Sequence, residues 1–202
     1  MQSNEELDRL CKAAVAETQR QNEALVRHIL RIIGEDPNRE GLLETPARVV
    51  KAWREWFSGY DQDPMSVFKS FADGAEGYQE MVVLDNIPVH SHCEHHMAPF
   101  IGTATVAYIP QGRIVGLSKI PRLVDIFAHR LQVQERLTQQ IADAMMEGLQ
   151  PKGVGVVLRC EHSCMSSRGV RKAGIGTTTS ALRGVFFSEP AVRAEFLSLS
   201  KG

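Results

Sequence analysis

Hydrophobic positions recur with a helical period over the first sixty residues. Apolar and polar residues alternate at helical spacing as far as Ile33, and Gly34 follows, which predicts one long amphipathic helix or two consecutive helices. Thr45 and Pro46 then provide a cap and a first-turn proline, and the helical period continues to Phe57. The pattern therefore predicts a second helix over about 46–58.

The period changes further along the chain, where short runs of β-branched residues predict strands. The turn formed by Pro110, Gln111 and Gly112 predicts that two of these runs pair as a hairpin. A helical period over 133–149 lies between the predicted strands 113–117 and 154–160. Ser188, Glu189 and Pro190 begin a final helix. The predicted strands are 81–84, 102–109, 113–117, 154–160 and 177–182.

This order of elements predicts an α+β fold, a two-layer unit in which an antiparallel β-sheet packs against helices, with an N-terminal helical extension. We expect one structural domain overall, made of a helical region over 1–60 and an α+β catalytic region over 80–202. Residues 60–80 carry Asp, Gly, Pro and Ser with little periodicity and are predicted to connect the two. A short sheet leaves open strand edges, so assembly through those edges is compatible with the pattern.

Composition and charge exclude several classes of function. The chain has 202 residues, of which 43% are hydrophobic, and a formal net charge of -1. The chain therefore has no overall positive charge that would attract it to nucleic acid or to an anionic membrane. The first residues lack the pattern of a secretory signal, which predicts a cytoplasmic protein. The four cysteines are too few and too unevenly spaced for a disulfide framework, so we expect them to be thiols, metal ligands or core residues.

The densest chemical feature is the segment 90–96, which holds four of the seven histidines and one cysteine. Cys93 and His96 are close enough in sequence to reach one ion from a turn, and mixed thiolate and imidazole ligands suit zinc. A third ligand must come from elsewhere, and His162 with Cys164 forms the only other such cluster. Cys160 ends an apolar run and is interpreted as a core residue.

Several polar residues are candidates for holding an anionic substrate. Ser118, Lys119 and Arg122 lie at a predicted strand-to-helix transition, where free backbone N–H groups and cations form anion sites. Taken singly, each basic residue is more often a solvated surface charge. Glu135, after Gln134 at the start of a helix, is either an ordinary first-turn acid or an acceptor for two donors of a guanine edge. The other candidate cations are Arg48, Lys51, Arg168 and Arg171.

Four motifs together resemble the GTP cyclohydrolase I family, over about 43–199. They are CEHHMAPF at 93–100, GLSKIPR at 116–122, QVQERLTQQIADA at 132–144 and HSCMSSRG at 162–169. Two departures lie in the last motif. Ser163 stands where an aromatic or apolar residue is frequent in the family, and Ser166 and Ser167 replace bulkier or basic residues. Neither removes a named functional group.

The resemblance implies a zinc enzyme of the tunnelling fold that hydrolyses GTP to formate and 7,8-dihydroneopterin triphosphate, the first step of pterin and tetrahydrofolate biosynthesis. It also implies a homodecamer with active sites at subunit interfaces. Zinc would be held by Cys93, His96 and Cys164, and His95 and His162 would be the acid-base pair. Guanine would be read by Glu135 with Gln134. The triphosphate would be held by Ser118, Lys119, Arg122 and Arg168, with Arg48 and Lys51.

Three alternatives remain open on residues alone. A nitrile reductase of deazaguanine metabolism would use a cysteine nucleophile without zinc, and a pyruvoyl-tetrahydropterin synthase would bind zinc through histidines such as His90 and His92. Neither explains Cys93, His96 and Cys164 together. A non-catalytic zinc module would need a fourth protein ligand, such as His95 or Cys160.

Overall fold

The computed structural model describes residues 2–72 and 77–200, and the chain divides into two compact units, Met1–Trp56 and Phe57–Gly202. The first unit contains α1 (Gln2–Ile32), a 3-10 turn η1 (Glu40–Leu42) and α2 (Thr45–Trp56). Both predicted helices are therefore confirmed. Gly34 follows α1 with φ +90°, a backbone conformation that ends helices and favours glycine. The division into 1–60, 60–80 and 80–202 stays a prediction.

The second unit carries the remaining elements. Its short helices and helical turns are η2 (Ser58–Asp61), η3 (Pro64–Val67), α5 (Ser163–Ser166) and α6 (Val185–Ser188). Its longer helices are α3 (Lys119–Ala128), α4 (Gln134–Leu149) and α7 (Pro190–Leu199). Its strands are β1 (Ser70–Phe71), β2 (Val82–Cys93), β3 (Pro99–Ile109), β4 (Ile114–Val115), β5 (Leu131–Gln132), β6 (Gly153–His162) and β7 (Gly176–Gly184).

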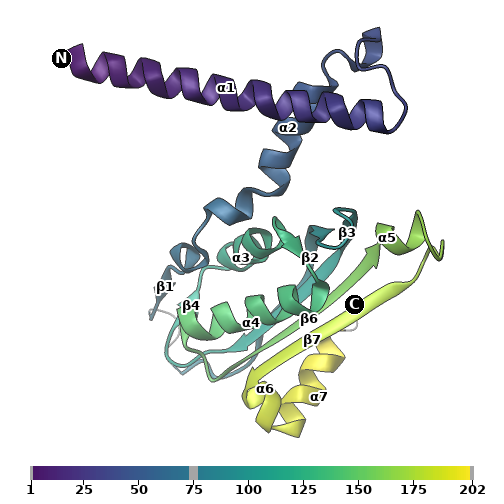
Figure 1. Cartoon of the computed structure of the whole chain (residues 1–202). Helices are drawn as coiled ribbons and strands as arrows, with labels where there is room; N and C mark the ends of the chain where they lie inside the picture. Colours follow the sequence, from purple (N-terminus) through teal and green to yellow (C-terminus); the bar gives the residue numbers. More distant parts are fainter. Residues whose placement is uncertain (1, 73–76, 201–202) are drawn as a thin grey trace. The chain divides into compact units, whose positions relative to one another are not determined.

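Five strands form one curled sheet in the order β5-β2-β3-β6-β7 (Figure 1). The four long strands run antiparallel to their neighbours, and only the two-residue β5 pairs in parallel, with the end of β2. The predicted α+β class with an antiparallel sheet against helices is thereby confirmed. The predictions of α4 and β7 are also confirmed, each within two residues of the expected bounds, and α7 begins at Pro190 as expected.

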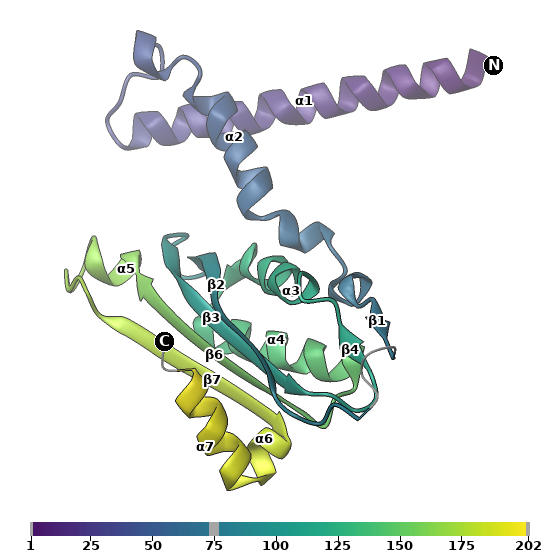
Figure 2. The same cartoon turned by 180° about the vertical axis from the view of Figure 1, so that it is seen from behind.

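Alternation along the strands separates two faces of the sheet. In β6, Val156 and Leu158 join the main core, to which α3 and α4 contribute, whereas Val157 packs with Phe186 and Phe196 of α6 and α7. Figures 1 and 2 show α3 and α4 on one side of the sheet and α6 and α7 on the other. The sheet is therefore covered on both faces, and the larger core lies under α3 and α4.

One predicted strand is too short, and one predicted pairing is wrong. The strand predicted at 81–84 forms, but it extends to Cys93 and therefore includes His90 and His92. The predicted hairpin of 102–109 with 113–117 does not form, because β3 is already paired on both sides by β2 and β6. Instead, β4 pairs with β1 in a separate two-stranded sheet.

The register of β3 positions the functional residues. Pro99 at its start lies opposite His92 of β2, and the next residue, Phe100, lies opposite His162 of β6. The ends of β2 and β6 therefore meet on the two sides of the start of β3. Within the described part of the chain, no helix has the length and apolar character needed to cross a membrane.

Candidate metal centre and active site

The first two candidate ligands come from the turn between β2 and β3. Cys93 is the last residue of β2 and is 6% exposed, and residues 94–96 form a turn. Met97 has φ +52°, and its N–H donates to the Cys93 carbonyl at 2.8 Å. The Cys93 N–H donates to the carbonyl of Ala98, also at 2.8 Å. This tight reversal places His96 Nδ1 3.9 Å from Cys93 Sγ.

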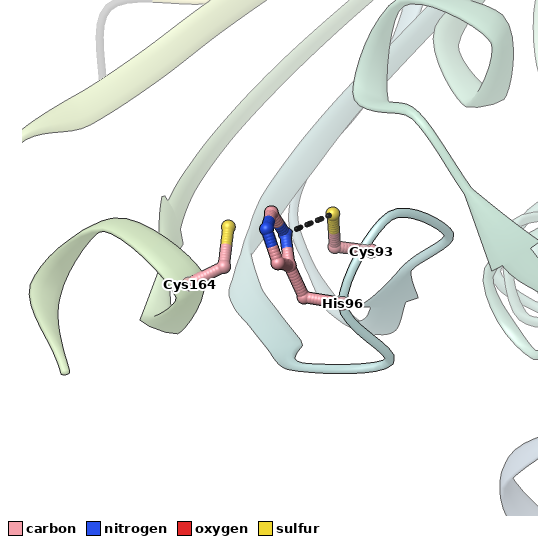
Figure 3. Close-up of side chains that lie close together, drawn as sticks. All are labelled: Cys93, His96 and Cys164. Atoms are coloured by element: carbon pink, nitrogen blue, oxygen red, sulfur yellow. Dashed lines mark hydrogen bonds between the residues drawn. The ribbon is translucent and has the colours of Figure 1, made fainter. Parts of the chain in front are cut away.

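The third candidate ligand is Cys164 of α5, which follows directly after β6. One ligand atom each from Cys93, His96 and Cys164 lies within 4.8 Å of the other two, and Figure 3 shows the three side chains converging. Burial, and then the neighbouring Cys93 thiol, raise the pKa of Cys164, whereas Arg168 opposes this. Two thiols this close deprotonate together only when a cation offsets their charge.

The donor set fits zinc. In a tetrahedral site with Zn–S of about 2.3 Å and Zn–N of about 2.0 Å, the sulfur and nitrogen ligands lie about 3.5 Å apart. The observed 3.9 Å between Cys93 and His96 is close to that value. Among the described residues, no further His, Cys, Asp or Glu joins the cluster. Three protein ligands are typical of catalytic zinc, whereas structural sites have four.

Cys160 does not take part in this cluster, as the sequence predicted. It lies on β6 opposite Gly102 and is 2% exposed. Burial raises its pKa to about 12. The thiol therefore stays protonated and packs as a small hydrophobic side chain.

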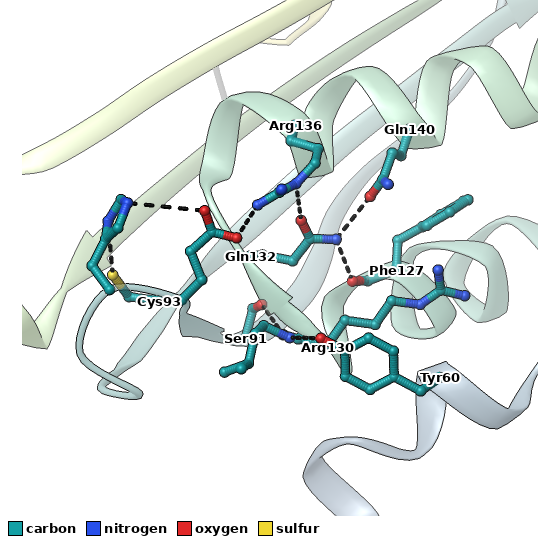
Figure 4. Close-up of polar contacts among 11 residues, drawn as sticks. Tyr60, Ser91, Cys93, Phe127, Arg130, Gln132, Arg136 and Gln140 are labelled. Atoms are coloured by element: carbon teal, nitrogen blue, oxygen red, sulfur yellow. Dashed lines mark hydrogen bonds and ion pairs between the residues drawn. The ribbon is translucent and has the colours of Figure 1, made fainter.

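A polar network joins the turn at residues 94–96 to α4 (Figure 4). Glu94 forms an ion pair with Arg136, and its other carboxylate oxygen lies 3.9 Å from His95 Nε2. Arg136 donates to Gln132, whose own amide donates to the Phe127 carbonyl at 2.9 Å and to Gln140 at 2.8 Å. The sequence reasoning missed Glu94 and Arg136, although both lie inside the quoted motifs. His95 is 64% exposed and is thus free to reach a bound molecule.

His162, at the end of β6, is held on two sides. Its Nε2 lies 2.9 Å from Gln134 Oε1, and its ring stacks on Phe100 with centroids 4.6 Å apart and an interplanar angle of 12°. Burial lowers the pKa of His162, and the nearby Glu135 carboxylate opposes this shift. The sequence reasoning missed Phe100, which the strand register places opposite His162.

Glu135 and Gln134 are neighbours in sequence but have opposite environments. Glu135 lies in the first turn of α4 and is exposed, close enough to His162 to act on its pKa. Gln134 is 1% exposed, and its amide contacts the protein interior. Glu135 is therefore accessible for the predicted recognition of guanine, whereas the amide of Gln134 is hydrogen-bonded to other groups of the protein.

Two of the predicted cations, Lys119 and Arg122 on α3, line one cavity of about 700 Å³. The same cavity is lined by Lys69 and His129, and by three acids, Asp61, Asp63 and Asp125. Burial raises the pKa of Asp125, and the nearby His129 opposes this. The cavity thus holds cations that suit an anion and acids that restrict where the anion can lie.

The other residues predicted to hold the triphosphate are distributed. Ser118 directly precedes α3, makes no capping hydrogen bond with its side chain, and is exposed. Arg168 follows α5, near Cys164. Arg48 and Lys51 lie on α2 in the first unit, where Arg48 pairs with Glu44. The roles of these four residues stay predictions.

Comparison with known proteins identifies relatives. The family model described as GTP cyclohydrolase I matches residues 22–201. A GTP cyclohydrolase 1 of Nitrosospira multiformis is 59% identical over 175 residues, covering 87% of this chain and 92% of the relative. One of Janthinobacterium sp. is 60% identical over 175 residues, covering 87% and 88%. A solved structure of an archaeosine synthase QueF-Like is similar with a TM-score of 0.43 and 19% identity, covering 52% of this chain and 93% of that one.

Proposed function

This chain belongs to the GTP cyclohydrolase I family, and we propose that it opens the guanine imidazole ring of GTP at a zinc ion held by Cys93, His96 and Cys164. The observation that carries the proposal is the convergence of these three ligand atoms within 4.8 Å at the ends of β2 and β6. The open three-ligand set favours a catalytic zinc enzyme over a zinc-stabilised module that lacks activity.

Bound at this site, zinc would supply Lewis acidity, which makes water a nucleophile near neutral pH. The chain's own part in the reaction begins with the carbon that must be attacked. C8 of guanine is a poor electrophile, so a proton given to the adjacent imidazole nitrogen eases attack. His162 is the residue for this step, since it lies two residues before Cys164 and close to exposed Glu135.

His95 serves the later proton transfers of ring opening and formate release. It follows Cys93 by two residues, with Nδ1 3.8 Å from the Cys93 sulfur. Its exposure leaves the ring accessible, and the neighbouring Glu94 pairs with Arg136 of α4. An imidazole suits this task because its ordinary pKa is close to neutral pH.

Recognition of GTP divides between its two ends. The Glu135 carboxylate is an acceptor for the N1–H and the exocyclic amine of guanine, which point in the same direction. Lys119 and Arg122, in their shared cavity, bind the triphosphate together with Ser118 and Arg168, and Arg48 and Lys51 add further positive charge. Holding the unreactive end keeps intermediates in place while the ring is rebuilt.

The product is 7,8-dihydroneopterin triphosphate, released after formate, and this is the first step of tetrahydrofolate biosynthesis. We place the reaction in the cytoplasm, where thiol ligands stay reduced. Incubation of the purified, zinc-loaded protein with GTP tests the proposal. We expect formate and, after oxidation, a fluorescent pterin in equal amounts. Zinc-loaded protein that binds GTP and yields neither product would overturn it.

We further propose a homodecamer with active sites at subunit interfaces. It is supported by the outer side of β7, which pairs with no other strand among residues 2–72 and 77–200. An unpaired edge invites pairing with another chain. Exposed Phe187 and Val170, at 69% and 65%, are compatible with further burial. Light scattering should give ten times the 22.4 kDa of one chain, whereas a monomer would contradict the assembly.

A further inference from the structure

The amide nitrogen of Gln134 is fully occupied inside the protein. Gln134 is the first residue of α4, and its Nε2 donates to the Leu158 carbonyl at 3.3 Å. It also donates to the Thr177 carbonyl at 2.9 Å and to the Thr179 hydroxyl at 3.1 Å. These acceptors belong to β6 and β7, so the amide ties α4 to two neighbouring strands.

These contacts fix which end of the amide faces His162. Two of the three acceptors are backbone carbonyls, which accept hydrogen bonds and cannot donate them, so the donating NH₂ must point to them. Oε1 is then left for His162 Nε2, at 2.9 Å. Because an amide oxygen only accepts, His162 Nε2 must carry a hydrogen. The environment of Gln134 therefore settles a tautomer that a ring hydrogen bond alone leaves undecided.

The ring has no second orientation of similar quality. Phe100 stacks against its face at 4.6 Å and 12°, which restrains the ring plane. Turning the ring over within that plane would remove Nε2 from the Gln134 oxygen. The oxygen and Phe100 together thus hold both the plane and the direction of the imidazole.

We propose that Gln134 is a positioning residue, whose amide oxygen accepts from Nε2–H and thereby fixes the orientation and the tautomer of the His162 ring. The inference rests on the proposed function, in which His162 delivers a proton to the guanine imidazole nitrogen. Gln134 then acts through His162, and guanine is read by Glu135 without it.

The tautomer can be measured directly, without turnover. Nitrogen NMR of the zinc-loaded protein with ¹⁵N-labelled histidine distinguishes a protonated from an unprotonated ring nitrogen, and the signals of His162 are those lost in His162→Ala. With the ring neutral, we expect hydrogen on Nε2 and none on Nδ1. Hydrogen on Nδ1 alone, or an even mixture, would overturn the proposal. This result stands apart from activity, so that failure to release formate refutes only the proposed function.

Two substitutions of Gln134 separate positioning from simple support of the fold. Gln134→Met keeps the length of the side chain and removes its hydrogen bonds, and kcat for formate release should fall on the order of 10²-fold. KM for GTP and the zinc content should stay near those of the unmutated protein. Gln134→Glu keeps an oxygen that accepts from Nε2–H, so its kcat should exceed that of Gln134→Met.

A merely structural role predicts the reverse order, because Gln134→Glu puts a carboxyl group against two buried carbonyls. Thr138→Val is the matched control. Thr138 is 1% exposed, lies one turn further along α4, and bonds to the Gln134 carbonyl and to Thr179 without touching His162. It should lose thermal stability and keep its kcat. Equal losses of kcat in all three variants would show that the fold, and not His162, is what Gln134 supports.

Discussion

Two cysteines four positions apart have opposite chemical characters because of where the chain places them. Cys160 faces the core from β6, whereas Cys164, on the following helical turn, is partly exposed beside Cys93 and Arg168. The raised pKa of Cys160 reflects burial alone, and nothing at its position offsets a thiolate charge. Residue type therefore does not decide ligation, whereas the site in which the thiol lies does.

This contrast gives a paired prediction. Cys164→Ala should lose bound zinc and with it all formate release, because two remaining ligands hold the ion weakly. Cys160→Ala should keep one zinc per chain and lose about 1 kcal/mol of unfolding free energy, since it only removes packing. Metal analysis and thermal unfolding of both variants check this. Equal zinc loss in the two would mean that Cys160 supports the metal.

A second variant distinguishes a histidine that transfers protons from one that binds the metal. His162→Ala should retain stoichiometric zinc and bind GTP, since His162 is not one of the three clustered ligands. Its rate of formate release should fall by about 10²- to 10⁴-fold, the usual contribution of a proton-transfer group. Metal analysis and a formate assay on the same preparation decide the matter. A variant isolated without zinc, or one with near-normal turnover, would refute the assignment.

Glu135→Gln tests guanine recognition. The amide would present a donor to a donor edge, and a hydrogen bond to a charged group contributes about 1.5–3 kcal/mol, so kcat/KM should fall by about 10- to 100-fold. Zinc content should not change, because Glu135 is outside the metal cluster. Steady-state kinetics with GTP measures the effect. Unaltered kcat/KM would remove Glu135 from the site.

At the scale of elements, the close approach of β3 and β6 depends on a residue without a side chain. A Cβ built on Gly102 would lie 1.9 Å from the Arg159 carbonyl oxygen and 2.6 Å from the Cys160 Cα. Both are backbone atoms of β6, so the strands would have to separate. Gly102 pairs with Cys160, two residues before His162, and a displacement here would reach the active site.

Gly102→Ala should therefore lower the unfolding free energy by about 1–3 kcal/mol, as overpacking does. Gly176→Ala is the control, because it is also in a strand, has an ordinary φ, and would meet no atom within 4 Å. Chemical denaturation of the two variants measures the difference. Equal stability of both would mean that the sheet absorbs the added methyl group without strain.

The sequence predicted the helices better than the strands, for physical reasons visible in β2. Its buried positions alternate correctly through Ile87, Val89, Ser91 and Cys93. Pro88 and the polar Ser91 at a buried position disguise this alternation, and an irregularity between Leu84 and Ile87 interrupts the pairing. Proline is tolerated because β5 pairs only with the last two residues of β2, which leaves the backbone at Pro88 without a partner on that side.

The failed hairpin has a different cause. A turn signal such as Gly112, with φ +73°, predicts that the chain reverses, but it does not say whether the neighbouring strand edge is free. Both edges of β3 are occupied by β2 and β6, which pair along almost its whole length. Local sequence carries no information about that competition, so β4 could not be assigned to its partner β1 in advance.

At the scale of the whole molecule, the sequence pointed to the residues that cluster, Cys93, His96 and Cys164, but not to the way in which the fold brings them together. Ligand chemistry is local, so motifs around Cys93 and Cys164 reveal it. The distance between the motifs depends on the order of strands, which places β3 between β2 and β6. The contacts that hold His162, to Gln134 and Phe100, likewise come from three separate elements and could not be deduced from spacing.

The position of β3 between the two ligand-bearing strands also orders events in time. Cys93 and Cys164 are far apart in the chain, and they meet only after β2, β3 and β6 have paired in register. We therefore expect the proposed zinc ion to be bound by all three residues only after the sheet has assembled. With free zinc a thousandfold above its dissociation constant, ligation should add about 4 kcal/mol to the unfolding free energy. That gain should appear as slower unfolding, with refolding unchanged by zinc or a chelator in stopped-flow experiments. Faster refolding with zinc would mean that the ion nucleates the sheet; otherwise, a newly made chain acquires its metal last.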